Sequence, residues 1–259
     1  ALKYTQQGCV SIYLESPKTL CIRDTGMTAV TDGEFPRAFW HLDFLAGLSG
    51  IRHVKAEAWS VHFEGHQPKA ETVVIEDRIG FPKDHPFLAA FDRVKRLAGD
   101  APVKFTIPSL SMLHLICCVR EANYKPIAAY AENPDLLFED LAAAWTDAML
   151  ALYERGCRYL QFDDTSWGEF CSEEKRAAYA ARGIDVDAVG RNYVKALNAV
   201  LAKKPADLTV TMHICRGNFR STWFSSGGYE PVAEILFANC NVDAFFLEYD
   251  SDRAGSFEP

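Results

Sequence analysis

Residues 208–215, LTVTMHIC, decide our prediction of the fold. The segment is a short apolar, β-branched run. It ends in two side chains that can bind a metal or take part in catalysis, His213 and Cys215. Such near-continuous apolar strands are typical of a parallel sheet covered by helices. Four other segments share this design: residues 27–34 (MTAVTDGE), 102–109 (PVKFTIPS), 158–164 (RYLQFDD) and 242–250 (VDAFFLEYD).

Helical patterns alternate with these strands. Residues 134–155 start at a proline and end just before Gly156, which are common start and stop signals of a helix. Further helices are predicted at residues 85–98, 187–203 and 229–238. The alternation indicates an α/β fold, either a (β/α)8 TIM barrel or an open doubly wound sheet. No GxGxxG or GxxxxGK[ST] loop follows a strand to favour the open sheet.

The barrel is favoured because every predicted strand delivers a polar group at its C-terminal end, where (β/α)8 barrels assemble their active sites. These groups are Glu34, Ser109, Asp163, His213 with Cys215, and Glu248. Residues 57–81 alternate polar and apolar side chains around a Gly-His-Gln-Pro turn and predict an inserted β-hairpin. We therefore predict one TIM-barrel domain over residues 1–259, with terminal barrel strands missing from it.

The composition favours an enzyme that acts on small molecules. A formal net charge of -8 excludes a general affinity for nucleic acid or anionic membranes, which require clustered Lys and Arg. No apolar run is long enough for a membrane helix, and the first residues lack the zones of a signal peptide. The eight cysteines are scattered, so reduced thiols and a cytoplasmic location are expected.

His213 and Cys215 are two residues apart on a predicted strand, so their side chains point to the same face. Imidazole and thiolate both suit zinc, and Glu248 at the end of the next strand can supply a third ligand. A catalytic zinc uses about three protein ligands and leaves a position for substrate. The alternative is that His213 is a core histidine and Cys215 a small buried hydrophobe.

Several motifs together resemble the cobalamin-independent methionine synthases, and most closely the short single-barrel relatives of their C-terminal catalytic domain. The motifs are residues 213–218 (HICRGN), 227–229 (GGY), 246–250 (FLEYD), 30–35 (VTDGEF), 40–44 (WHLDF) and 161–164 (QFDD). The resemblance implies that His213, Cys215 and Glu248 bind zinc. It also implies that Glu34 and Asp163 hold the ammonium group of homocysteine, and that Ser109 contacts its carboxylate.

Each substrate residue has a simpler interpretation. Asp163 and Asp164 could cap the helix that follows their strand, because an aspartate there satisfies free backbone N–H groups. Glu34 could be a solvated loop carboxylate paired with Arg37. Ser109 could be a turn residue after Pro108.

The activity that the resemblance implies is that of a 5-methyltetrahydropteroyltriglutamate–homocysteine S-methyltransferase, a step of methionine biosynthesis. Zinc makes the homocysteine thiol nucleophilic, and a methyltetrahydrofolate donates the methyl group. The departing amine requires a general acid, for which no residue is assigned. The fourth zinc ligand of the family, a cysteine on a later strand, has no counterpart before Pro259.

Three alternatives remain open. A sister reaction would use zinc to activate another thiol, such as coenzyme M, for attack on an epoxide or another alkyl donor. A metal-free decarboxylase of the uroporphyrinogen decarboxylase kind would have no need of the His-x-Cys pair. A noncatalytic barrel could retain ligand binding alone.

Overall fold

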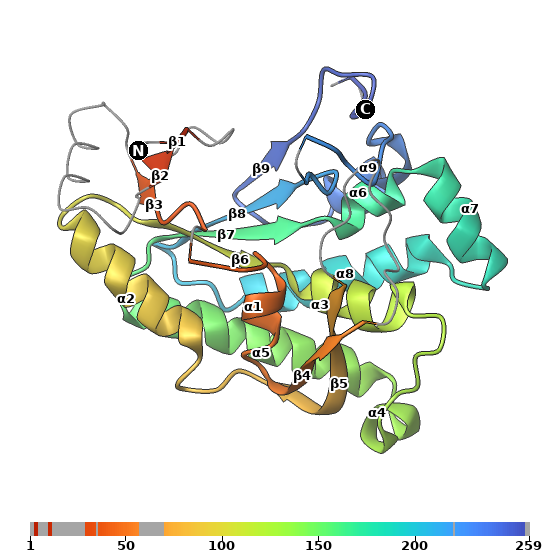
Figure 1. Cartoon of the computed structure of the whole chain (residues 1–259), viewed down its shortest axis with the longest axis horizontal. Coiled ribbons are helices and arrows are strands. Elements are labelled where there is room, and N and C mark those ends of the chain that lie inside the picture. The colour runs from red at the N-terminus through yellow and green to blue at the C-terminus, as the bar shows by residue number, and fades with distance from the viewer. Residues whose placement is uncertain are drawn as a thin grey trace.

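A parallel sheet forms the centre of the computed structural model, which describes residues 3–4, 10–11, 29–34, 36–56, 70–219 and 221–256. Four strands pair in the order β6–β7–β8–β9, all parallel (Figure 1). Their bounds are β6 (Lys104–Pro108), β7 (Tyr159–Asp164), β8 (Thr209–Ile214) and β9 (Ala244–Leu247). Each strand lies inside a predicted segment, so the predicted α/β fold with a parallel sheet is confirmed.

The first predicted strand segment, residues 27–34, contains the short strand β3 (Val30–Thr31). It lies beside the start of β6, because the Val30 N–H donates to the Pro102 carbonyl (2.9 Å). Two further short strands, β1 (Lys3–Tyr4) and β2 (Val10–Ser11), join β3 in a sheet of their own. Among the described residues the strands therefore form three sheets, and their pairing is not that of a closed ring.

Four helices occupy the predicted positions. They are α2 (Pro86–Ala98), α5 (Asp135–Glu154), α8 (Val186–Leu201) and α9 (Glu230–Leu236). In Figure 1, α2, α5 and α8 lie on the same side of the sheet, and α5 packs against α8. The Trp145 indole of α5 donates to the Pro108 carbonyl (2.8 Å) and fixes this helix to the end of β6. Within the described ranges, no helix is both long and apolar enough to cross a bilayer.

Other helical segments lie between the strands or between the strands and these helices. They are α1 (Leu42–Leu45), α3 (Leu110–His114), the π-helix η2 (Leu115–Arg120), α4 (Ala128–Glu132), α6 (Ser166–Phe170) and α7 (Glu173–Ala181). The turns that begin α3 and α6 follow directly on β6 and β7, so they lie close to the strand ends where the predicted site residues gather.

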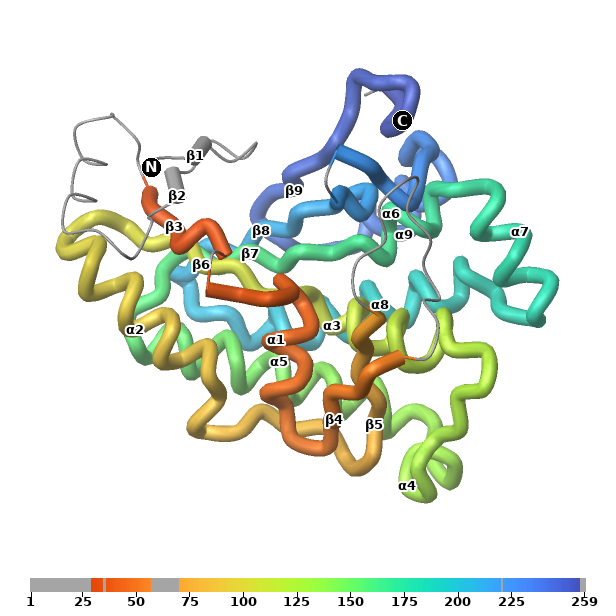
Figure 2. Tube along the Cα trace, in the orientation of Figure 1, coloured from red at the N-terminus to blue at the C-terminus, as the bar shows by residue number. Residues whose placement is uncertain are grey.

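The first strand of the inserted hairpin differs from the predicted one. Strand β5 (Glu71–Gly80) falls within residues 57–81, but it pairs antiparallel with β4 (Ser49–Lys55), which precedes that range. Residues 57–69, with the predicted turn, lie outside the described residues. The pair lies beside α5 (Figure 2), where Arg78 forms an ion pair with Asp140 (2.6 Å).

The two faces of the parallel sheet differ in chemistry. Side chains alternate along a strand, so Leu160 and Phe162 of β7 pack into the apolar core on the helix side. Gln161 and Asp163 lie on the opposite face, where the Gln161 amide donates to the Asp163 carboxylate (2.6 Å). The face away from the helices is therefore polar at the C-terminal ends of the strands.

Asp164, the last residue of β7, joins several elements on the helix side. It is fully buried, and its carboxylate accepts hydrogen bonds from the Ser166 N–H of α6 (2.7 Å) and from the Ser111 hydroxyl of α3. Its carbonyl accepts from the Cys215 N–H (3.2 Å). The Asp164 carboxylate therefore binds a backbone N–H at the start of α6, although the N-cap residue of that helix is Thr165, whereas the Asp163 side chain bonds Gln161.

Replacing Asp164 with alanine should destabilise the fold. The change leaves the Ser166 N–H buried without its acceptor and removes the charged acceptor of the Ser111 hydroxyl, which keeps only the Ser109 hydroxyl. A buried unpaired donor costs about 1–3 kcal/mol. We expect Asp164→Ala to lower the free energy of unfolding in urea by at least about 2 kcal/mol. Asp147→Ala, at an exposed position of α5, should change it by less than about 0.5 kcal/mol. Equal losses in the two variants would contradict the role of Asp164.

Candidate metal centre

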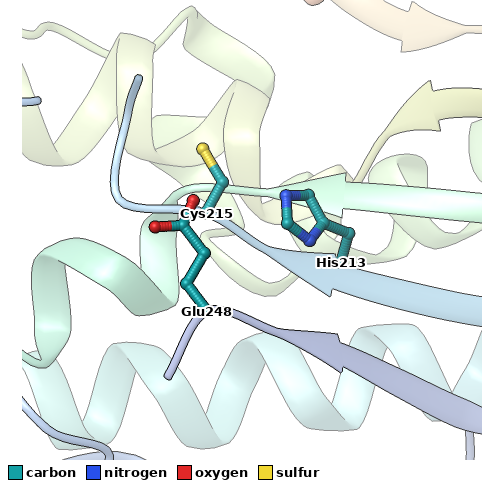
Figure 3. A group of neighbouring side chains, drawn as sticks. All are labelled: His213, Cys215 and Glu248. Atoms are coloured by element: carbon teal, nitrogen blue, oxygen red, sulfur yellow. The ribbon is translucent and has the colours of Figure 1, made fainter. Parts of the chain in front are cut away.

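Three predicted metal ligands converge at the C-terminal ends of β8 and β9 (Figure 3). One ligand atom each from His213, Cys215 and Glu248 lies within 4.8 Å of the other two. The strand register explains this convergence. His213 pairs with Phe246 in the parallel ladder, so the next residues on the same side of the two chains are Cys215 and Glu248.

His213 is held in the form that a metal ligand requires. Its Nδ1 lies 2.9 Å from the Phe246 carbonyl oxygen, and a carbonyl only accepts, so Nδ1 carries the proton. The lone pair of the imidazole is therefore on Nε2. Burial lowers the pKa of His213, so the ring is neutral at pH 7. A backbone carbonyl on the second ring nitrogen is a usual partner of a metal-binding histidine.

Cys215 is a half-buried thiol whose protonation state depends on a nearby cation. Burial raises its pKa to about 12, although a hydrogen bond from the Gly217 N–H to Sγ (3.0 Å) opposes the rise. Without a cation the side chain is a neutral thiol. A metal ion next to Sγ would reverse this preference, because coordination deprotonates a thiol. Imidazole, thiolate and carboxylate together are a donor set that suits zinc.

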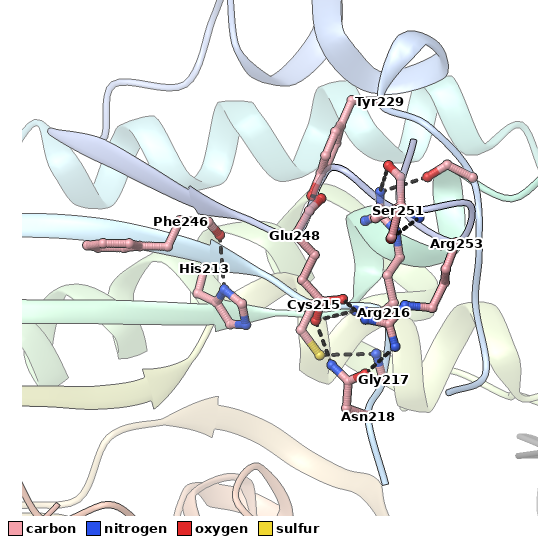
Figure 4. A network of polar contacts seen from close by, with 12 residues as sticks. His213, Cys215, Arg216, Gly217, Asn218, Tyr229, Phe246, Glu248, Ser251 and Arg253 are labelled. Atoms are coloured by element: carbon pink, nitrogen blue, oxygen red, sulfur yellow. Dashed lines mark hydrogen bonds and ion pairs between the residues drawn. The ribbon is translucent and has the colours of Figure 1, made fainter. Parts of the chain in front are cut away.

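Glu248 is bound by the chain at both carboxylate oxygens (Figure 4). Oε2 accepts from Arg253 Nη2 (2.5 Å), and Oε1 accepts from Asn218 Nδ2 (2.5 Å) and from the Arg216 N–H (3.4 Å). The Tyr229 hydroxyl donates to the Glu248 carbonyl (2.9 Å). Asn218 and Tyr229 lie in motifs quoted above without an assigned role, and Arg253 carries no signal in the sequence.

Glu34 stands on a turn in the left-handed region, with a φ of 61° after Gly33 at 63°. Its carboxylate accepts from the Thr106 hydroxyl of β6 (2.6 Å) and lies 3.3 Å from Arg37 Nη1. The predicted pairing with Arg37 is thus present. The bond to Thr106 also directs Glu34 toward the sheet, so it is half-buried and not a freely solvated carboxylate.

Glu34 and Asp163 form an acidic pair beside the metal candidates. Burial raises the pKa of both carboxyls, and the charge of Asp163 raises that of Glu34 further, while Arg37 lowers both. The charge of Glu34 also reaches His213, where it raises the pKa. Both carboxyls are half-buried, and Lys104 lowers the pKa of Asp163 as Arg37 does. A carboxyl pair with raised pKa values can accommodate a further cation, such as an ammonium group, by releasing a proton.

Ser109 is fully buried at the end of β6. Its N–H donates to the Asp163 carbonyl (2.8 Å), and its hydroxyl lies 2.8 Å from the Ser111 hydroxyl, which bonds Asp164. The structure therefore brings five of the six predicted site residues together at one edge of the sheet. The hydroxyl of the sixth, Ser109, instead lies with Ser111 and Asp164.

Comparison with known proteins gives relatives in sequence and in fold. No family model matches the chain. Two Bacillus subtilis (strain 168) proteins, the uncharacterized YxjG and YxjH, are 43% and 41% identical to it over 238 residues. The match covers 92% of this chain but only 61% and 60% of those proteins, so the chain spans about three fifths of their length.

Two solved structures share the fold. A Listeria monocytogenes protein provisionally named a vitamin-B12-independent methionine synthase is 38% identical, with a TM-score of 0.67 over 88% of this chain and 58% of that chain. A B12-independent methionine synthase from Shewanella sp. W3-18-1, in complex with selenomethionine, is 15% identical. Its TM-score is 0.62 over 90% of this chain and 61% of that one. The predicted resemblance to the cobalamin-independent methionine synthase family is therefore confirmed, because in sequence and in fold this chain is related to proteins that carry that name.

Proposed function

We propose that the protein is a zinc-dependent thiol methyltransferase that transfers a methyl group from a methyltetrahydrofolate to homocysteine and gives methionine. The observation that carries the proposal is the convergence of His213, Cys215 and Glu248 within 4.8 Å. A metal-free decarboxylase would not need three such donors. The likeness to the Listeria protein supports methyl transfer as the type of reaction.

His213 Nε2, Cys215 Sγ and a Glu248 oxygen would hold the zinc ion. When bound, zinc lowers the pKa of a thiol substrate and presents its sulfur as a thiolate. Other groups of the chain hold these ligands in position. The Phe246 carbonyl fixes the tautomer of His213, and the partners of Glu248 hold its carboxylate near the other two donors. The three ligands are half-buried, so their electrostatic interactions are screened less than those of fully exposed side chains.

Glu34 and Asp163 would bind the ammonium group of homocysteine. Their buried negative charges favour an amino acid thiol over a thiol without an amine, such as coenzyme M. The selenomethionine in the Shewanella structure supports an amino acid ligand for this fold. Ser109 is our proposed contact for the substrate carboxylate, because its N–H bonds the carbonyl of Asp163 and places it beside the pair.

The proposal includes a (β/α)8 barrel as one domain, of which the described parallel sheet is a part. The likeness to two methionine synthase structures supports it. It also includes a cytoplasmic location, because a thiol substrate and six free cysteines among the described residues suit a reducing compartment.

The first test is the metal content of protein purified without added metal. We expect about one zinc per chain, and X-ray absorption should detect one additional sulfur ligand when homocysteine is added. A thiol competition assay should rank homocysteine above coenzyme M, because only homocysteine offers an ammonium group to Glu34 and Asp163. Protein that binds no zinc, even when zinc is supplied, would refute the proposed function.

Cys215→Ser should remove most of the zinc and the activity while leaving the fold intact, because a hydroxyl is a far weaker zinc ligand than a thiolate. Metal analysis and circular dichroism measure the two outcomes. Cys157→Ser is the matched control, since Cys157 is buried and lies just before the start of β7, at the opposite end of that strand from Asp163. Normal zinc content in Cys215→Ser would show that the ligand assignment is wrong.

A further inference from the structure

Arg253, Asn218 and Glu248 form a closed ring of hydrogen bonds (Figure 4). Arg253 donates through Nη2 to Glu248 Oε2 (2.5 Å) and through Nη1 to Asn218 Oδ1 (2.6 Å). Asn218 in turn donates through Nδ2 to Glu248 Oε1 (2.5 Å). Both oxygens of the carboxylate are thus held, and each partner is held by the other.

A tight turn brings Arg253 back to Glu248. The Asp250 N–H donates to the Gly255 carbonyl (2.8 Å), and residues 251 and 255 form an antiparallel bridge. The Arg253 carbonyl accepts from the Gly227 N–H (2.8 Å), and its guanidinium lies 5.1 Å from the centre of the Trp223 ring. These contacts fix Arg253 independently of its bond to Glu248, so it can act as a support for that side chain.

We propose that Arg253 is a positioning residue that, together with Asn218, orients the Glu248 carboxylate toward His213 and Cys215 for metal binding. The proposal rests on the proposed function. The side chain of Glu248 is only 11% exposed, so little water is available to hold its charge in place of Arg253. Each carboxylate oxygen has two lone pairs, so the ring occupies part of the accepting capacity and leaves the remainder for an ion.

The opposite role for Arg253 would be competition, in which the guanidinium draws Glu248 away from the metal ligands. The geometry argues against it. The ligand atoms of His213, Cys215 and Glu248 lie within 4.8 Å of one another while the bond from Arg253 to Glu248 is in place. The two roles predict opposite changes in metal affinity when Arg253 is replaced.

The test is the zinc affinity of the purified protein, measured by competition with a chromophoric chelator. We expect Arg253→Gln to bind zinc about 10- to 100-fold more weakly than the unmodified protein, as when outer partners of metal ligands are removed. Arg253→Lys should also bind more weakly, because an ammonium group cannot hold Asn218 and Glu248 in one rigid fork. Arg52→Gln is the matched control, since it breaks an exposed ion pair with Glu76 (2.7 Å) and should leave the affinity unchanged.

Asn218→Ala provides a second test at an exposed position. It should also weaken zinc binding, and the double variant with Arg253→Gln should lose less than the product of the two separate factors, because both changes open the same ring. Unchanged or tighter zinc binding in folded Arg253→Gln, Arg253→Lys and Asn218→Ala would overturn the positioning role. That result is distinct from a failure of the proposed function, in which the unmodified protein and Arg52→Gln bind no zinc either.

Discussion

The parallel register of β8 with its two neighbours is the constraint on which the site depends. β8 pairs His213 with Asp163 of β7 on one side and with Phe246 of β9 on the other. This register places the candidate cation-binding acid and the candidate metal ligands at the same edge of the sheet. A slip of one residue would turn each of these side chains to the opposite face. The apolar residues of the helix side specify the register, because a slip would bring them out of the core.

The two adjacent aspartates of β7 show how one strand contributes both to the candidate site and to the stability of the fold. Asp163 faces the polar side, where it contributes to an acidic pair with Glu34. Asp164 faces the helix side, where it accepts from the first turns of α3 and α6. The buried charge of Asp164 is offset by these hydrogen bonds, whereas burial raises the pKa of both carboxyls of the pair on the other face. Arg37 opposes this rise at both carboxyls, and Lys104 opposes it at Asp163. The pair lies on the side of the sheet that a ligand would reach.

Much of the fold could be predicted because apolar strands and amphipathic helices leave a local pattern in the sequence. All five strand segments and four helices are present at the expected positions. Strand β4 was missed, since its residues Ser49–Lys55 carry charges and a glycine and owe their structure to pairing with β5. The predicted ligands could be placed because strand spacing fixes the side to which they point. The bonds from Ser109 to Asp163 and from Arg253 to Asn218 could not, because they join residues far apart in the sequence whose contact depends on the whole fold.

Under the proposed function, the charges around the candidate metal centre would favour a bound thiolate. Arg253 contributes one positive charge beside Glu248, and His213 is neutral. With a divalent ion bound, the thiolate of Cys215 and the carboxylate of Glu248 would together cancel the charge of the ion and leave that of Arg253. Under the proposed function, a bound substrate thiolate would bring the half-buried centre to neutrality, which a site of low dielectric constant favours. The acidic pair of Glu34 and Asp163 would apply the same principle to the ammonium group of the proposed substrate.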